Sequence, residues 1–160
     1  MYRYNIGVIG GSKTNDHYCS VAYKIGELLS EKNCIIVCGG EGGVMECVSK
    51  GAFDHNGIVI GILPGFDKND GNKYLTIKLP TGIGYIRNFL IVRASDVIIA
   101  IDGYSGTTSE AAFAITEGKT VVSIGDMEIK NKDSDGKFIK AATPEDAVHI
   151  AMEEVKKIYE

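Results

Sequence analysis

The sequence predicts an α/β protein with a Rossmann-like, doubly wound, mostly parallel sheet that has helices on both faces. Three observations support this fold class. Strand-like and helix-like segments alternate from one end of the chain to the other. The strand-like segments are continuously apolar, as residues 97–101 are, which is typical of parallel strands buried on both sides. Three of these segments end in glycine-rich turns.

The first part of the chain alternates three strands with two helices. Apolar runs predict strands at residues 5–9, 34–38 and 58–63. Between them, residues 16–31 carry apolar side chains at helical spacing. A second helix runs through Met45, Val48 and Ala52 and is expected to end near Asn56 and Gly57.

The middle of the chain is more polar before it returns to a buried strand. Residues 66–72 predict a turn, and residues 74–79 alternate like a short strand. The spacing predicts a helix over 84–95 and then the buried strand 97–101. The helix over 84–95 has an apolar face made of Ile86, Phe89, Leu90 and Ala94.

The last part predicts two more helices and two more strands. A helix over 107–117 is expected to stop at Gly118, and a strand follows at 120–124. Residues 128–137 are polar, and 138–142 form a short final strand. Thr143 is placed to cap a C-terminal helix, with Pro144 at its first position.

Length and composition indicate one domain over residues 1–160, with 44% hydrophobic and 24% charged residues. The net charge of −4 argues against a nucleic-acid partner. No apolar stretch approaches the roughly 20 residues that cross a bilayer, and the N-terminus lacks a signal-peptide core. We therefore expect a cytoplasmic protein with neither a nucleic-acid nor a membrane partner.

The cysteines and histidines predict no metal site, and we expect no bound cofactor. No pair of cysteines has the C-x-x-C spacing, and the three histidines are scattered along the chain. The expected state is four reduced thiols in a core. The cysteines are Cys19, Cys34, Cys38 and Cys47, and the histidines are His17, His55 and His149.

Glycine-rich turns follow three of the predicted strands, at residues 10–12, 39–43 and 103–107. Each turn alone could be only a tight connection, because none has the spacing of a dinucleotide fingerprint or an NTPase loop. The carboxyl ends of parallel strands share one edge, however, so the three turns together predict a phosphate or nucleotide site. The candidate binding residues are Gly10, Gly11, Ser12, Gly39, Gly40, Gly43, Gly103, Ser105, Gly106, Thr107 and Thr108.

Glu110 follows Thr107 by three residues, which places both on one face of the predicted helix. A carboxylate beside a phosphate costs electrostatic energy, so its presence indicates chemistry on a phosphorylated ligand. The alternative is a carboxylate that the helix dipole favours near the N-terminus.

Residues 87–110 resemble the signature of the Lonely Guy phosphoribohydrolases, a family often labelled lysine decarboxylases. Arg87 stands nine residues before Asp96, as the family's arginine stands before its aspartate. The family's P-G-G-x-G-T-x-x-E loop is matched by Gly103, Gly106, Thr107 and Glu110. Residues 39–45 are similar to its G-G-x-x-G-x-M turn, and the similarity covers residues 6–124. Nothing here resembles the lysine setting that amino-acid decarboxylation needs.

The resemblance implies hydrolysis of a nucleoside 5′-monophosphate to a free base and ribose 5-phosphate. Glu110 would stabilise positive charge on the sugar or orient water. Arg87 would pair with the phosphate or position Glu110, unless it is only a surface charge of the helix. The family also implies a homo-oligomer, a dimer or a tetramer, in which the apolar face of the 84–95 helix either takes part or is buried in the core.

Two departures point to a related branch. The family's P-G-G is replaced by Asp102, Gly103 and Tyr104, and the lysine after its arginine is replaced by Asn88. In these respects the chain is similar to the molybdenum-cofactor carrier-like proteins, whose members share the fold and bind a ligand. The alternative function is therefore a carrier or sensor of a nucleotide-like cofactor.

Overall fold

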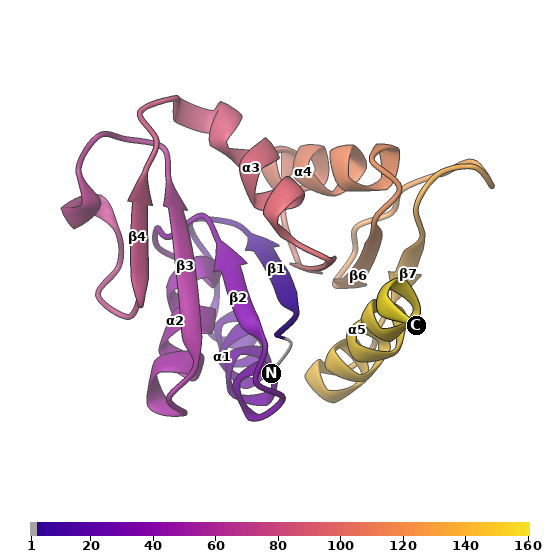
Figure 1. Ribbon diagram of the computed structural model, residues 1–160, viewed down its shortest axis with the longest axis horizontal. Coiled ribbons are helices and arrows are strands. Elements are labelled where there is room, and N and C mark those ends of the chain that lie inside the picture. The colour runs from indigo at the N-terminus through magenta and orange to yellow at the C-terminus, as the bar shows by residue number, and fades with distance from the viewer. Residues whose placement is uncertain (1–2) are drawn as a thin grey trace.

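The computed structural model describes residues 3–160, so the first two residues of the predicted domain lie outside the described part. Within it, seven strands form one parallel sheet in the order β4-β3-β2-β1-β5-β6-β7 (Figure 1). The predicted α/β, Rossmann-like fold class is confirmed. The strands are β1 (Asn5–Gly10), β2 (Ile35–Cys38), β3 (Ile58–Leu63), β4 (Ile77–Pro80), β5 (Val97–Ile101), β6 (Thr120–Ile124) and β7 (Phe138–Lys140).

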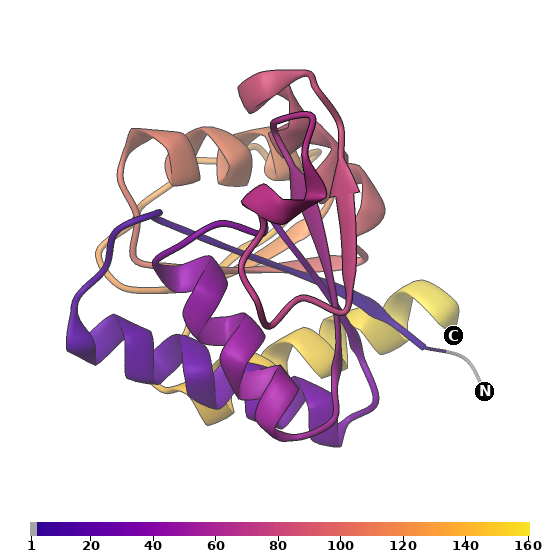
Figure 2. The ribbon, with the colours of Figure 1, turned by 90° about the vertical axis from the view of Figure 1, so that its left-hand side faces the viewer.

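Helices cover both faces of the sheet (Figure 2). One face carries α1 (Asp16–Glu31), α2 (Val44–Asp54) and α5 (Pro144–Tyr159). The other face carries α3 (Arg87–Ala94) and α4 (Ser105–Thr116), and short 3-10 turns lie at η1 (Lys68–Asp70) and η2 (Gly84–Ile86). No helix of residues 3–160 has both the length and the apolar character needed to cross a bilayer.

Strand β5 shows how the sequence supplies two cores. All five of its residues are buried, and their side chains alternate between the two faces of the sheet. Val97, Ile99 and Ile101 join the core under α1, α2 and α5. Ile98 and Ala100 join the core under α3 and α4. A strand buried on both faces must be apolar at every position, which explains the continuous run in the sequence.

The predicted 84–95 helix is the element in which structure and expectation differ most. It divides into η2 and α3, and the apolar face expected from Ile86, Phe89 and Leu90 is 42–63% exposed. The buried face carries Arg87 and Ile91 instead. Arg87 is buried because its guanidinium donates to carbonyls at the sheet edge. Of the two alternatives for the apolar face, burial in the core is therefore wrong, and contact with a second copy stays a prediction.

Other boundaries shift by a few residues. Helix α4 begins at Ser105, two residues before the predicted start, and the strand expected at 74–79 forms at 77–80. The cap on α5 is confirmed, since the Thr143 hydroxyl accepts a hydrogen bond of 3.1 Å from the Asp146 amide.

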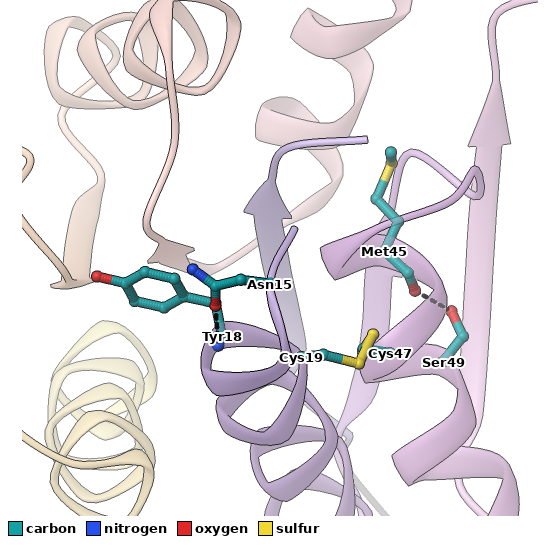
Figure 3. The surroundings of a disulfide bond; sticks show 6 residues. All are labelled: Asn15, Tyr18, Cys19, Met45, Cys47 and Ser49. Atoms are coloured by element: carbon teal, nitrogen blue, oxygen red, sulfur yellow. Dashed lines mark hydrogen bonds between the residues drawn. A yellow bond between two sulfur atoms is a disulfide. The ribbon is translucent and has the colours of Figure 1, made fainter. Parts of the chain in front are cut away.

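A disulfide bond between Cys19 and Cys47 joins α1 to α2 (Figure 3). The expectation of four reduced thiols is therefore wrong for this pair, and it holds for Cys34 and Cys38, which are free and buried. Burial raises the pKa of the Cys34 thiol to about 11. The expectation followed from the predicted cytoplasmic location, which stays a prediction.

The close packing of α1 against α2 brings these two cysteines together. It depends on glycines at the crossing, because a Cβ on Gly26 would lie 2.2 Å from the Val48 carbonyl oxygen and one on Gly51 would lie 2.0 Å from the Tyr23 carbonyl oxygen. Such a contact between residues 28 positions apart depends on helix pairing, which the spacing of the cysteines does not reveal.

Candidate functional site

The candidate site lies at the carboxyl edge of the sheet, above β2, β1 and β5. These strands are adjacent and parallel, so the three glycine-rich turns that follow them share this edge. The chain builds the sheet outward from β1 in one direction through β2 and in the other through β5. Ligands of open α/β sheets bind at such a point of reversal.

A cleft of about 370 Å³ opens at this point, a size suited to a small-molecule ligand. It is bounded by the end of β1, the start of α2, the η2–α3 segment and the first turns of α4. Its lining residues are Ile9, Gly10, Gly11, Ser12, Lys13, Glu41, Met45, Tyr85, Arg87, Asn88, Ile91, Tyr104, Gly106, Thr107 and Glu110.

The turn at residues 39–43 supports the turn at residues 10–12. The Val44 amide donates a hydrogen bond of 3.0 Å to the Gly11 carbonyl. Gly43 has a φ of 63°, and a Cβ there would lie 2.3 Å from the same carbonyl oxygen. Only glycine suits this position, because it combines left-handed backbone with a close approach.

The N-terminus of α4 faces the cleft with an uncapped first turn. Its N-cap residue, Tyr104, makes no side-chain capping hydrogen bond. The preceding Asp102 and Gly103 have φ values of 49° and 123°, which turn the chain sharply from β5 into the helix. Gly106 lines the cleft, and a Cβ there would meet no atom within 4 Å. Free amides and the helix dipole together make this turn suitable for an anion.

Arg87 is 4% exposed and connects three elements around the cleft. Its Nε donates to the Ile62 carbonyl over 2.9 Å, and its Nη2 lies 2.6 Å from Glu41 Oε1. It also donates to Asn88 Oδ1 and, over 3.4 Å, to the Gly39 carbonyl. The alternative that Arg87 is a surface charge is wrong, and its direct pairing with a ligand stays a prediction.

Glu110 lines the cleft from α4 and is 9% exposed. Among the interactions within residues 3–160, it has no hydrogen-bond or ion-pair partner. Burial raises the pKa of its carboxyl group to about 7, although the positive charge of Arg87 acts in the opposite direction. A carboxyl group with this pKa exchanges its proton near neutral pH, as a general acid or base must.

The structure brings together seven of the predicted site residues and leaves the others outside the cleft lining. Gly10, Gly11, Ser12, Arg87, Gly106, Thr107 and Glu110 line it. Gly39, Gly40, Gly43, Gly103, Ser105 and Thr108 do not, within the described residues. The Thr108 hydroxyl donates to the Tyr104 carbonyl over 3.1 Å, so it serves the helix itself. The roles of all the predicted site residues in binding stay predictions.

Sequence reasoning missed Glu41 and Tyr85 in the cleft. Glu41 stands inside a glycine-rich turn, where an acidic residue at the end of a strand is a usable signal. Tyr85 follows Gly84, whose φ is 65°, and nothing in the local pattern distinguishes this tyrosine from others. Residues 3–160 contain no cluster of three or more His, Cys, Asp or Glu residues placed to hold a metal ion.

Comparison with known proteins places this architecture among related chains. The profile of the SLOG cluster4 family matches residues 3–148. An uncharacterized protein of Archaeoglobus fulgidus is 43% identical over 119 residues, which are 74% of this chain and 78% of that protein.

Solved structures match nearly the whole chain. The molybdenum cofactor binding protein of Rippkaea orientalis is 30% identical with a TM-score of 0.86, over 100% of this chain and 99% of that one. The molybdenum cofactor carrier protein of Chlamydomonas reinhardtii is 26% identical with a TM-score of 0.84, over 96% and 99%. DNA processing protein A of Streptococcus pneumoniae shares the fold alone. It is 16% identical with a TM-score of 0.68, over 92% of this chain and 61% of that one.

Proposed function

We propose that this chain, which belongs to the SLOG cluster4 family of the Lonely Guy/SLOG superfamily, binds a nucleotide-like phosphorylated small molecule in the cleft. The observation that carries the proposal is the uncapped first turn of α4, which opens onto that cleft. The ligand's phosphate would accept hydrogen bonds from the amides of this turn. The turns at residues 10–12 and 103–107 would enclose it.

Carriage of the ligand without chemical change is the function that we favour. Solved structures that match over 96–100% of this chain are described as a molybdenum cofactor binding protein and a molybdenum cofactor carrier protein. Arg87 is already paired with Glu41, so its charge is partly neutralised before any phosphate arrives. Asp102 and Tyr104 further separate this loop from the phosphoribohydrolase pattern.

Hydrolysis of an N-glycosidic bond is the second candidate, and Glu110 is the observation that favours it. Its pKa of about 7 suits a group that takes a proton from water. In this reaction the water oxygen bonds to C1′ as the C1′–N bond breaks. The base nitrogen takes the electron pair and a proton, which leaves free base and ribose 5-phosphate.

Ligand binding is tested by thermal unfolding with nucleoside 5′-monophosphates and with the matching nucleosides. A phosphate-dependent site predicts stabilisation by the monophosphates alone, of roughly 2–3 kcal/mol at a hundredfold excess over Kd. Gly106→Glu should abolish the stabilisation because it adds negative charge where the cleft is open, and the isosteric Gly106→Gln should retain more of it. Equal stabilisation by nucleosides would contradict the proposal, as would equal behaviour of the two variants.

The same incubations separate carriage from hydrolysis when free base is measured by chromatography. Carriage predicts binding with no base released from any nucleotide. Release by the native chain and not by Glu110→Gln would instead establish hydrolysis and assign Glu110 to it. The glutamine preserves the shape of the side chain and removes its ability to accept a proton.

A homo-oligomer is the second part of our proposal, with the exposed apolar face of η2 and α3 against a second copy. Ile86 and Leu90 are four residues apart and are 63% and 42% exposed. Phe89 stacks on Phe113 of α4, with 4.3 Å between ring centroids, so the apolar surface continues onto α4. Adjoining apolar side chains of this kind mark interaction surfaces.

Light scattering after size-exclusion chromatography tests this contact. The variant with Ile86→Glu and Leu90→Glu should elute as a monomer, because two carboxylates would be buried without partners at the interface. Phe53→Ser, which changes an exposed aromatic residue on α2, should keep the oligomer. A native chain that is monomeric at all concentrations would contradict the proposal.

A further inference from the structure

We propose that Tyr85 and Tyr104 form an aromatic subsite that binds a planar heteroaromatic ring of the ligand. The inference deepens the proposed function, on which it rests, by assigning the residues that bind the ring of the nucleotide-like ligand. Both tyrosines line the cleft, and they come from two different elements, η2 and the N-cap of α4.

Both aromatic rings are uncovered. Tyr85 is 85% exposed and Tyr104 is 80% exposed, although tyrosines are usually part-buried. Within residues 3–160, neither ring stacks on another ring or lies under a cation, and neither hydroxyl makes a hydrogen bond. The ring faces that could stack on a flat ligand are therefore available. No contact within the described residues gives either side chain a structural role.

The backbone presents both side chains in the same way. Each tyrosine directly follows a glycine with positive φ: Gly84 at 65° precedes Tyr85, and Gly103 at 123° precedes Tyr104. A residue with a Cβ rarely adopts these angles, so each turn depends on its glycine. Both turns lie at the cleft, which indicates that they place the tyrosines there.

Tyr104 also sets the order of the two ligand groups. It immediately precedes the first turn of α4, where the phosphate is proposed to bind. A ring joined to that phosphate through a sugar would lie a few ångströms further along the cleft, between α4 and η2. Tyr85 lines the cleft from η2, so the two tyrosines would hold the ring between α4 and η2.

Stacking contributes to affinity without requiring a particular base, since every base has a π face. Loss of one stacking side chain weakens binding on the order of tenfold, within a range of roughly 5- to 150-fold. The subsite therefore predicts that a nucleotide binds more tightly than a sugar phosphate without a ring.

Isothermal titration with AMP, GMP, CMP, UMP and ribose 5-phosphate tests the subsite. The native chain should bind at least one nucleotide on the order of 10- to 100-fold more tightly than ribose 5-phosphate. Tyr85→Leu and Tyr104→Leu should each weaken nucleotide binding about tenfold more than they weaken ribose 5-phosphate binding. The Phe variants should retain the preference, and Tyr74→Leu, outside the cleft lining, is the matched control.

The results separate this inference from the proposed function. If nucleotides and ribose 5-phosphate bind equally well, or if the Leu variants lose both ligands equally, the aromatic subsite is wrong and the phosphate site stands. If neither class binds the native chain, both proposals are wrong.

The absence of tryptophan from the sequence allows an independent measurement. Tyr104→Trp introduces a single tryptophan at the cleft. Stacking against a bound ring should quench its fluorescence, and ribose 5-phosphate at saturation should leave it unchanged. Equal quenching by both ligands would overturn the assignment of Tyr104.

Discussion

Replacement of Glu110 by glutamine is expected to stabilise the fold by about 3 kcal/mol near pH 8 and to change it little near pH 5. Burial raises the pKa of this carboxyl group from 4.5 to about 7, so the folded chain holds the proton more tightly than the unfolded chain. Stability is therefore lost as the pH rises from 4.5 towards 7, and the full cost of a buried, unpaired carboxylate remains above 7. Glutamine is neutral throughout and avoids that cost.

Urea unfolding of both chains at the two pH values measures this effect. Glu31→Gln is the control, since Glu31 is exposed on α1 and its replacement should change stability little at either pH. A gain for Glu110→Gln of equal size at both pH values would show that its cause is not titration. A loss near pH 8 would show that the carboxylate has a stabilising partner.

Loss of the disulfide between Cys19 and Cys47 is expected to lower the free energy of unfolding by roughly 3–4 kcal/mol, the value for a closed loop of this length. The bond restricts the unfolded chain and ties α1 to α2. Unfolding with and without dithiothreitol measures the effect, alongside the variant with Cys19→Ser and Cys47→Ser. The native chain should lose stability in dithiothreitol, while the double variant should be unaffected by it.

Two outcomes would contradict this prediction. Equal stability of the native chain and the double variant without reductant would show that the bond contributes nothing. A count of four reactive thiols in the unreduced, unfolded chain would show that the bond is absent, because only Cys34 and Cys38 are free when the bond is present.

Much of the fold could be predicted because the residue pattern of several elements is compatible with only one type of secondary structure. The run at 97–101 is apolar at every position, and Thr143 with Pro144 marks a helix start, so β5 and α5 begin where expected. Whether the apolar face of the 84–95 helix is exposed or buried could not be decided from the sequence, since that helix has two apolar stripes. The choice between them depends on Arg87, which reaches the Ile62 carbonyl in another element.

The sequence predicted the backbone turns that form the site more completely than the side chains that line it. Glycine-rich turns after parallel strands must share an edge, which explains why the turns at residues 10–12 and 103–107 lie together. The pairing of Glu41 with Arg87 joins residues 46 positions apart, and it depends on the packing of α3 over the sheet. The disulfide likewise depends on the crossing of α1 and α2, and neither contact leaves a periodic signal.

The central position of β1 also constrains the order in which the chain assembles during synthesis. Strands β1 to β4 all leave the ribosome before β5. The amide of Asn5 can donate to the carboxylate of Asp96 only after 91 further residues have been synthesised. Closing so long a loop is entropically costly, and pairings of this kind form slowly. Until then the nascent half-sheet exposes the apolar edge of β1, a hazard for aggregation. Cys19 and Cys47 both lie in this early half, so their bond can hold α1 against α2 before β5 pairs with β1.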